Sequence, residues 1–195
     1  FTLGFDYKHF DQVSSVAAGE LFSTPITYYP LSFDYSATWT KKGSVTDFDA
    51  NVIANLRGLG SNDIEFDLNR FKARGSFLYL RGSIAHTHDL PHDLQLFGKI
   101  QGQIADQPLV SSEQLAGGGL ATVRGYLEAE STGDNGVFGS IELRSPQLAT
   151  WTKSEGNDWR AYVFADGGVL ELRDALPGQA SSYTLASVGI GTRVR

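Results

Sequence analysis

GGGLATVRGYLEAESTGDNG, residues 117–136, is the most distinctive stretch of the sequence. It is too rich in glycine for a helix, and it carries no hydrophobic stripe. Long loops in a chain with strand-like patterning are usually functional or disordered. Because Val123, Arg124 and Tyr126 bring a branched apolar side chain, a cation and an aromatic ring close together, we expect a loop that folds against the flanking strands.

The composition indicates a β protein with many turns. The 195 residues suit a single domain and include 22 Gly, 12 Phe and 8 Tyr, against 19% charged residues. No apolar run approaches the roughly 18 residues of a membrane-spanning helix, which leaves a membrane β-barrel open. A net charge of −6 without a basic run argues against nucleic acid as the main partner. The absence of cysteine excludes disulfides and thiolate metal sites.

Apolar and polar residues alternate with a period of two, which predicts about eight strands and no helix. The small and polar segments 11–25 and 57–70 are predicted to be loops, and 106–135 to be a third long connection. Residues expected on the apolar sides of the strands include Leu31, Phe33, Val52, Leu78, Leu80, Ile84, Ile100, Ile104, Val137, Ile141, Val163, Val188 and Ile190.

Three features favour an antiparallel transmembrane β-barrel over a soluble β-sandwich binding module, which would show the same alternation. The strands are long, roughly 10–14 residues, and the connections alternate between long and short. The apolar faces also end in aromatic residues, as interfacial girdles do. These residues are Phe1, Tyr7, Tyr29, Trp39, Trp159 and Tyr183. On this interpretation the glycine-rich loop lies on the extracellular side.

Three motifs, in order along the chain, resemble outer-membrane translocators and assembly factors that carry periplasmic POTRA domains. The motifs are Val123-Arg124-Gly125-Tyr126, then Ile141-Glu142-Leu143-Arg144, and then Phe164-Ala165-Asp166-Gly167-Gly168, which matches a Phe-x-Asp-x-Gly pattern. A strand rich in Gly and Gln, followed by Ser-Ser-Glu-Gln at 111–114, looks most like the two-partner secretion branch, the hemolysin-activation/secretion transporters. The resemblance is clear over residues 94–168.

The resemblance implies a sixteen-stranded barrel in which the loop folds back into the lumen. Residues 1–195 would be the C-terminal part of this barrel domain, without the POTRA domains, the early strands and the last two strands. It further implies outer-membrane translocation of a large secreted partner polypeptide of the hemolysin or adhesin type, with no cofactor and no catalysis. Contact with outer-membrane lipid is expected, and unpaired strand edges would favour self-association. The alternative within the superfamily is a barrel-assembly factor.

The strand phases put Glu142 and Asp166 on the polar side of neighbouring strands, where Arg124 is their natural partner. A planar guanidinium with five donors suits carboxylates better than a lysine does. We expect Phe164 to pack against Tyr126 or against the stem of Arg124. The alternative is a solvated arginine in a surface loop. The expected contacts between loop and wall involve Val123, Arg124, Gly125, Tyr126, Glu142, Phe164, Asp166 and Gly168.

Other polar clusters give weaker predictions. The spacing of His86, His88 and His92 invites a metal ion, but a short polar turn with incidental histidines is favoured, because the chain has no cysteine and no convincing carboxylate geometry accompanies the histidines. The acids Glu128, Glu130, Glu142 and Asp166 suggest a glycosidase pair only formally, since nothing marks a sugar-binding groove. The glycine cluster lacks the Gly-Lys-Ser/Thr of a phosphate-binding loop. We therefore predict that the chain is not an enzyme.

Overall fold

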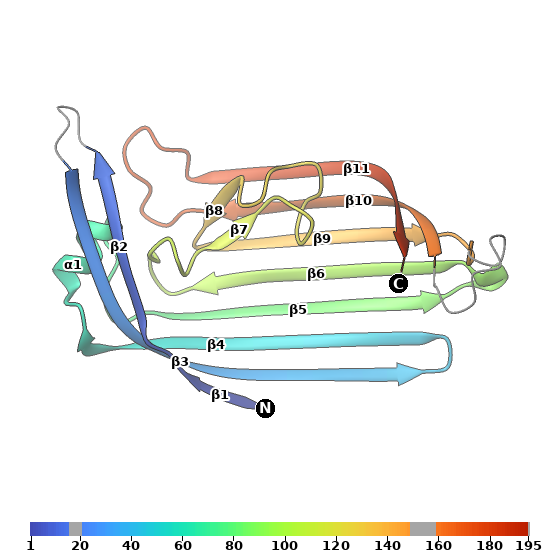
Figure 1. The fold of residues 1–195 in the computed structure, drawn as a ribbon, viewed down its shortest axis with the longest axis horizontal. Helices are drawn as coiled ribbons and strands as arrows, with labels where there is room; N and C mark the ends of the chain where they lie inside the picture. Colours follow the sequence, from blue (N-terminus) through green and yellow to red (C-terminus); the bar gives the residue numbers. More distant parts are fainter. Residues whose placement is uncertain (16–20, 149–158, 195) are drawn as a thin grey trace.

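The computed structural model describes residues 1–15, 21–148 and 159–194. Within this part of the chain, nine strands form one antiparallel sheet, in the order β1-β3-β4-β5-β6-β9-β10-β11 with β2 also paired to β3 (Figure 1). The strands of the sheet are β1 (Thr2–Phe5), β2 (Lys8–Ser15), β3 (Leu21–Lys41), β4 (Ser44–Gly60), β5 (Leu78–Asp89), β6 (Gln95–Ala105), β9 (Asn135–Arg144), β10 (Trp159–Glu171) and β11 (Ser182–Val194). The remaining elements are α1 (Asp63–Asn69), the 3-10 turn η1 (Pro91–Asp93), β7 (Leu115–Gly117) and β8 (Ser131–Gly133).

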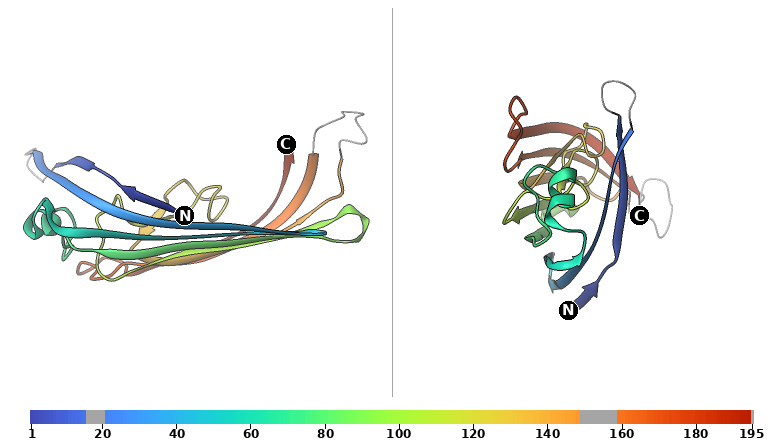
Figure 2. Two further views of the ribbon diagram at one scale, coloured as in Figure 1. Left: turned by 90° about the horizontal axis from the view of Figure 1, so that it is seen from below. Right: turned by 90° about the vertical axis from the view of Figure 1, so that its left-hand side faces the viewer.

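The sheet is curved along its strands and across its width, which makes it an open trough (Figure 2). β1 pairs with residues 31–34 of β3, and β2 pairs with residues 21–28 of the same strand. The two short strands therefore lie end to end and together make one edge, so the described sheet is eight strands wide. β7 and β8 form a separate two-stranded sheet on the concave side of the trough. This arrangement confirms the prediction of an antiparallel all-β fold of about eight strands.

The two faces of the sheet differ in polarity. On the convex face, register places Ile84 opposite Ile100, which in turn lies opposite Gly139 of the next strand. Such apolar side chains are exposed in strand after strand; they include Leu31, Phe33, Val52, Leu78, Leu80, Ile84, Ile100, Ile104, Val137, Ile141, Val163, Val188 and Ile190. The period-two pattern therefore predicted the outward-facing residues correctly. Phe77 and Tyr79, whose phase conflicted with Leu78 and Leu80, point to the concave side and are buried.

The connections leave the sheet at its two ends (Figure 1). At one end, the turns at 42–43 and 90–94 are short, but residues 145–158 join β9 to β10 at this same end, so the predicted alternation of long and short connections is wrong there. At the other end lie the connections 61–77, 106–134 and 172–181, and the first of these contains α1. The loop between β6 and β9, residues 106–134, is the one that folds back over the concave face.

A hydrophobic cluster closes the loop-bearing end of the concave face. Tyr28, Phe66, Phe77, Leu109 and Val110 are among its buried members, so strands, helix and loop all contribute. The rings of Tyr28 and Phe66 have centroids 5.8 Å apart, and those of Tyr28 and Phe77 are 5.9 Å apart in an edge-on arrangement. The cluster matters for the site because it holds the first residues of the β6–β9 loop against the wall.

The prediction of no helix is wrong for residues 63–69. Asn62 accepts hydrogen bonds from Ile64 N and Glu65 N, and the Glu65 side chain accepts one from Asn62 N, which completes a capping box. A helix of seven residues is marginal alone, and here the burial of Phe66 in the cluster stabilises it. Among the described residues, neither α1 nor η1 has the length and hydropathy of a membrane-spanning helix.

Three further predictions are corrected by the structure. Segment 11–25 is not a loop, because β2 continues to Ser15 and β3 begins at Leu21; residues 16–20 lie outside the described part of the chain. Segment 57–70 is likewise structured, since β4 runs to Gly60 before α1 begins. In both cases main-chain pairing with a neighbouring strand outweighs the weak strand propensity of small and polar residues. Tyr183 packs on the concave side against the buried cluster that contains Phe138 and Leu185, so it is not part of an outward aromatic girdle.

Replacing Phe66 by Ala should lower the free energy of unfolding by about 3–5 kcal/mol, because a fully buried ring would leave a cavity between Tyr28 and Phe77. Thermal unfolding and limited proteolysis of residues 61–75 would measure the effect. Ile64→Ala is the matched control, since Ile64 lies in the same helix and is 71% exposed. Equal effects of the two substitutions would contradict the packing role of Phe66.

Candidate functional site

The candidate site lies where the β6–β9 loop meets the concave face of β9, β10 and β11. We divide this loop into a base, residues 106–117 and 131–134, and a tip, residues 118–130. β7 and β8 belong to the base and pair with each other, so they form the neck from which the tip extends. Figure 1 shows the tip lying over β9 and β10, well inside the trough.

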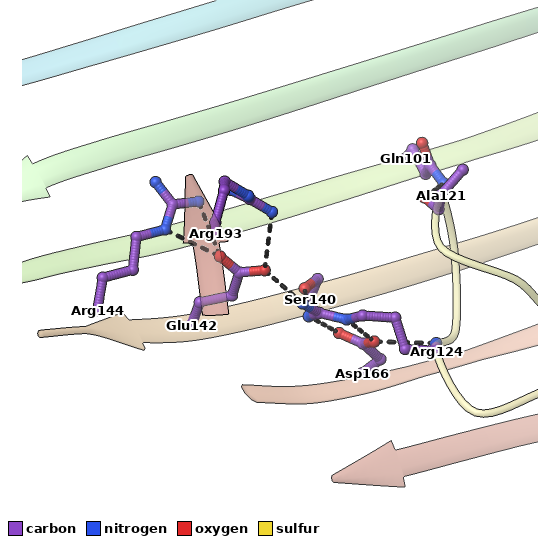
Figure 3. A network of polar contacts seen from close by, with 8 residues as sticks. All are labelled: Gln101, Ala121, Arg124, Ser140, Glu142, Arg144, Asp166 and Arg193. Atoms are coloured by element: carbon purple, nitrogen blue, oxygen red, sulfur yellow. Dashed lines mark hydrogen bonds and ion pairs between the residues drawn. The ribbon is translucent and has the colours of Figure 1, made fainter. Parts of the chain in front are cut away.

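Arg124 of the tip binds Asp166 of β10 with three donors (Figure 3). Its Nε donates to Asp166 Oδ2 at 2.7 Å and its Nη2 to Oδ1 at 2.6 Å, which is the parallel two-bond geometry that favours arginine over lysine. The backbone N–H of Arg124 also donates to Oδ2, at 3.1 Å. Main chain and side chain of one residue are thus fixed to a single carboxylate.

The same guanidinium reaches β9. Its Nη1 donates to Glu142 Oε1 at 2.5 Å and its Nη2 to Ser140 Oγ at 3.0 Å. Beneath it, the ring of Phe164 lies 3.6 Å from the guanidinium carbon, a cation–π contact. Four side chains from two adjacent strands therefore surround one cation, and the Arg124 side chain is only 11% exposed.

Strand register explains why these four residues meet. In the β9–β10 pair, Asp166 lies opposite Ser140 and Phe164 lies opposite Glu142. Residues two positions apart on a strand share a face, so all four point to the concave side. The two carboxylates therefore sit diagonally across the strand pair, and a flat guanidinium between them can bind both.

The two carboxylates differ in what else binds them. Glu142 Oε2 accepts hydrogen bonds from Arg144 Nε at 2.9 Å and Nη2 at 2.8 Å, and Arg193 Nη2 lies 3.9 Å from Oε1 (Figure 3). For Asp166, the ion pair with Arg124 is the one found among the described residues. Withdrawal of Arg124 would thus leave Glu142 paired and Asp166 without a cation.

The carboxylates also act on the arginine. The hydrogen bonds that Asp166 accepts are the main cause that raises the pKa of the Arg124 guanidinium above its ordinary value, and those to Glu142 add to this, although burial opposes it. Arg124 is therefore a permanent cation. Its attachment depends on the wall carboxylates and not on its own protonation.

The remaining predicted contact residues line the same region. Val123 is fully buried in a cluster with Phe138 and Leu185. Tyr126 donates its hydroxyl to Ala186 O of β11 at 3.3 Å. Phe164 contacts the guanidinium of Arg124, one of the two partners considered for it. The two glycines serve different needs: Gly125 has a φ of 90°, and Gly168 lies opposite Phe138, whose ring occupies the place of a side chain there.

The other polar candidates lie apart from this cluster. The rings of His86 and His88 stack with centroids 6.1 Å apart on the convex side of β5, and His92 lies in η1. In the described ranges, no group of three or more His, Asp or Glu side chains is placed to hold a metal ion. Glu128 accepts a hydrogen bond from Leu120 N inside the tip.

Two further carboxylates hold the loop, and sequence reasoning missed both. Glu113 of the base is 1% exposed and accepts hydrogen bonds from Lys8 Nζ and Tyr28 OH, each at 2.6 Å, and from Tyr79 OH at 2.7 Å. Asp134, in the Gly-Asp-Asn-Gly segment, is fully buried. The signals were visible as Ser-Ser-Glu-Gln at 111–114 and Gly-Asp-Asn-Gly at 133–136. The side-chain partners of Glu113, however, are 34 to 105 residues away in the chain, and those of Asp134 are 20 to 64 residues away.

Comparison with known proteins agrees with this architecture. The family model described as haemolysin secretion/activation protein ShlB/FhaC/HecB matches residues 16–194. The chain belongs to this family. The outer membrane transporter CdiB of Dickeya dadantii (strain 3937) is 27% identical over 148 residues, which is 76% of this chain and 26% of that protein. The structure of CdiB from Escherichia coli superposes with a TM-score of 0.65 at 20% identity, over 89% of this chain and 32% of the other.

Membership of the ShlB/FhaC/HecB family confirms the resemblance to two-partner secretion transporters and places the chain in the outer membrane of Gram-negative bacteria. The structural likeness confirms the fold, and the single large sheet excludes the β-sandwich architecture. The family is one of transporters and not a class of enzymes. The chain spans about a third or less of the length of these two relatives.

Because Arg124 binds Asp166 through three donors and Glu142 through one, Asp166→Asn should free the tip far more than Glu142→Gln does. Loss of one partner from a buried ion pair costs about 3–5 kcal/mol, so maleimide labelling of a cysteine at the buried Val123 position should accelerate on the order of 100-fold in Asp166→Asn. Glu142→Gln should change the rate by less than about tenfold, since Arg124 keeps its three hydrogen bonds to Asp166.

The control for this comparison is Asp47→Asn on β4, whose carboxylate accepts a hydrogen bond from Thr38 at an exposed position. Its labelling rate should match that of the parent carrying the cysteine alone. Equal acceleration by the substitutions at 142 and 166 would show that the three-donor contact of Arg124 with Asp166 holds the tip no more strongly than its single bond to Glu142.

Proposed function

We propose that the chain forms a contiguous part of the wall of a sixteen-stranded outer-membrane barrel that exports a large partner polypeptide of the hemolysin or adhesin type. The fraction of each relative that the chain spans supports a larger whole. So does the strand order, because β1 and β11 stand at opposite ends of the described sheet and are not paired with each other. Further strands on both edges would satisfy their main-chain groups.

The polarity of the two faces supports lipid outside and a polypeptide passage inside. Exposed side chains such as Ile100, Ile141 and Val163 would be costly in water and suit the hydrocarbon of a bilayer. The concave face carries Asp34, Asp49 and other polar residues. A wall of this kind suits an extended, unfolded polypeptide with its hydrated backbone, and no nucleotide or other cofactor enters the proposal.

The observation that carries the function is the attachment of Arg124 to Asp166 and Glu142. It holds a loop across the concave side, where an exported chain would have to pass. We infer that the loop controls passage: its tethered position maintains a defined state of the channel, and export depends on the Arg124 contacts.

Arg124→Ala in the complete protein should leave membrane insertion intact and reduce secretion of the partner by about tenfold or more, since the loop loses an anchor worth several kcal/mol. Secreted partner in the medium, normalised to the amount of inserted transporter, is the measurement. Arg124→Lys should give an intermediate rate, because an ammonium group cannot bind Asp166 through two parallel bonds.

Lys42→Ala, in the exposed turn between β3 and β4, is the control for loss of one positive charge. It should secrete at the parental rate. Secretion at the parental rate by normally inserted Arg124→Ala would remove the loop from the proposed mechanism.

A further inference from the structure

The base of the β6–β9 loop is attached to the wall at a place remote from Arg124. The carboxylate of Glu113 is enclosed by Lys8 of β2, Tyr28 of β3 and Tyr79 of β5, as described above. Its backbone carbonyl accepts a further hydrogen bond from Gln103 Nε2 at 3.2 Å. One loop residue therefore binds four strands, and an acid this deeply buried is stable only while those donors surround it.

A second attachment closes the other side of the base. Asp134 Oδ1 accepts a hydrogen bond from Leu109 N, and Oδ2 accepts one from Arg173 N, both at 2.8 Å. Arg70 Nη2, just after α1, lies 3.5 Å from Oδ2. Asp134 thus connects the start of the loop, its end, α1 and the β10–β11 connection through one fully buried side chain.

Apolar packing adds to these two attachments. Leu109 and Val110 are buried in the same cluster as Phe66 and Phe77, and Leu115 packs with Leu170. Displacing the base would expose these side chains and unpair two buried carboxylates at once.

The tip has fewer attachments. Besides the Arg124 cluster and the buried Val123, its polar contacts with the wall are the Tyr126 hydroxyl with Ala186 and a hydrogen bond from Gln101 Nε2 to Ala121 O at 2.9 Å. Leu120 and Leu127 are 84% and 77% exposed. The tip therefore depends on Arg124 to a degree that the base does not.

The boundary between the two parts falls at the glycine cluster. A Cβ at Gly117 would collide with Phe138 and Leu170, so this residue is pressed against the wall with the base. Gly118 and Gly119 follow with φ of 107° and 83°, values that glycine adopts freely and other residues do not. Backbone rotation at these positions can move the tip while residue 117 stays in place.

We propose that the β6–β9 loop works in two parts: a static base, positioned by Glu113 and Asp134, and a moving tip, residues 118–130, which Arg124 holds down. This inference rests on the proposed function and names the segment that moves. Glu113 and Asp134 are positioning residues, because they affect passage of the exported chain by fixing where the tip lies.

Distances between spin labels can test the two parts separately. The chain contains no cysteine, so introduced cysteines in it are unique. One label at exposed Ser111 reports on the base, one at Leu120 reports on the tip, and each is paired with a reference label at Thr184 on the outward side of β11. Pulsed electron paramagnetic resonance is recorded on the complete protein in lipid.

In Arg124→Ala the tip distances should shift and broaden, while the base distances stay as in the parent. In Glu113→Gln, which keeps the shape and removes the charge, the base distances should broaden as well. Tyr79→Phe removes a single hydrogen bond to Glu113 and should broaden the base distances less; it serves if Glu113→Gln fails to accumulate in the membrane. Base and tip shifting together in Arg124→Ala, or unchanged base distances in Glu113→Gln, would overturn the two-part loop.

A reversible cross-link separates this inference from the proposed function. Gln101 Nε2 lies 2.9 Å from Ala121 O, so cysteines at positions 101 and 121 are within reach of a short, reducible bis-thiosulfonate linker that would lock the tip to β6. The matched control is the same linker on Ala116→Cys with Thr132→Cys, a facing pair inside the base. Cross-linking should stop secretion in the tip-locked protein, reduction should return it to the rate of the same variant without linker, and the control should secrete in both states. Unimpaired secretion with the tip locked would overturn the gating function, whereas the label distances alone decide whether the loop has two parts.

Discussion

A guanidinium held between two buried carboxylates is the interaction on which the arrangement of the concave face depends. Each of these charges would be unfavourable so far from water without the others. Asp166 and Glu142 sit on the wall, Arg124 sits on the loop, and the charges are satisfied when the loop lies in the trough. The contact therefore attaches a loop to a continuous antiparallel sheet and fixes the position of the loop.

The register of the sheet places the two carboxylates on the same face. Glu142 and Asp166 share a face because β9 and β10 pair with Phe164 opposite Glu142 and Asp166 opposite Ser140. A slip of one residue would turn one of the acids to the apolar convex face, where no cation could reach it. The same register places Val163 and Ile141 outward, so the burial of the charges and the exposure of the apolar band are consequences of one pairing.

The base of the loop is attached to the wall by more contacts than the tip. Glu142 is neutralised by Arg144 whether or not the loop is present, whereas Asp166 depends on Arg124. Glu113 and Asp134 enclose the base with donors from several elements, whereas the tip meets the wall mainly through one side chain. In such a loop the tip can move while the base stays attached to the wall.

Alternation along each strand was sufficient to predict the antiparallel sheet and the outward-facing residues, because side-chain direction in a strand has a period of two that the chain carries locally. The same local rule put Glu142 and Asp166 on polar faces, and the Val-Arg-Gly-Tyr motif named Arg124 as the cation to set beside them. What local patterning could not supply was the short helix at 63–69, the continuation of β2 and β3 into small and polar residues, and the partners of Glu113 and Asp134. These depend on contacts between segments far apart in the chain: Phe66 needs Tyr28 and Phe77, and Glu113 needs Lys8 across 105 residues. Burial turns a turn-like aspartate or an ordinary glutamate into an anchor, and burial is a property of the folded sheet and not of the residues taken singly.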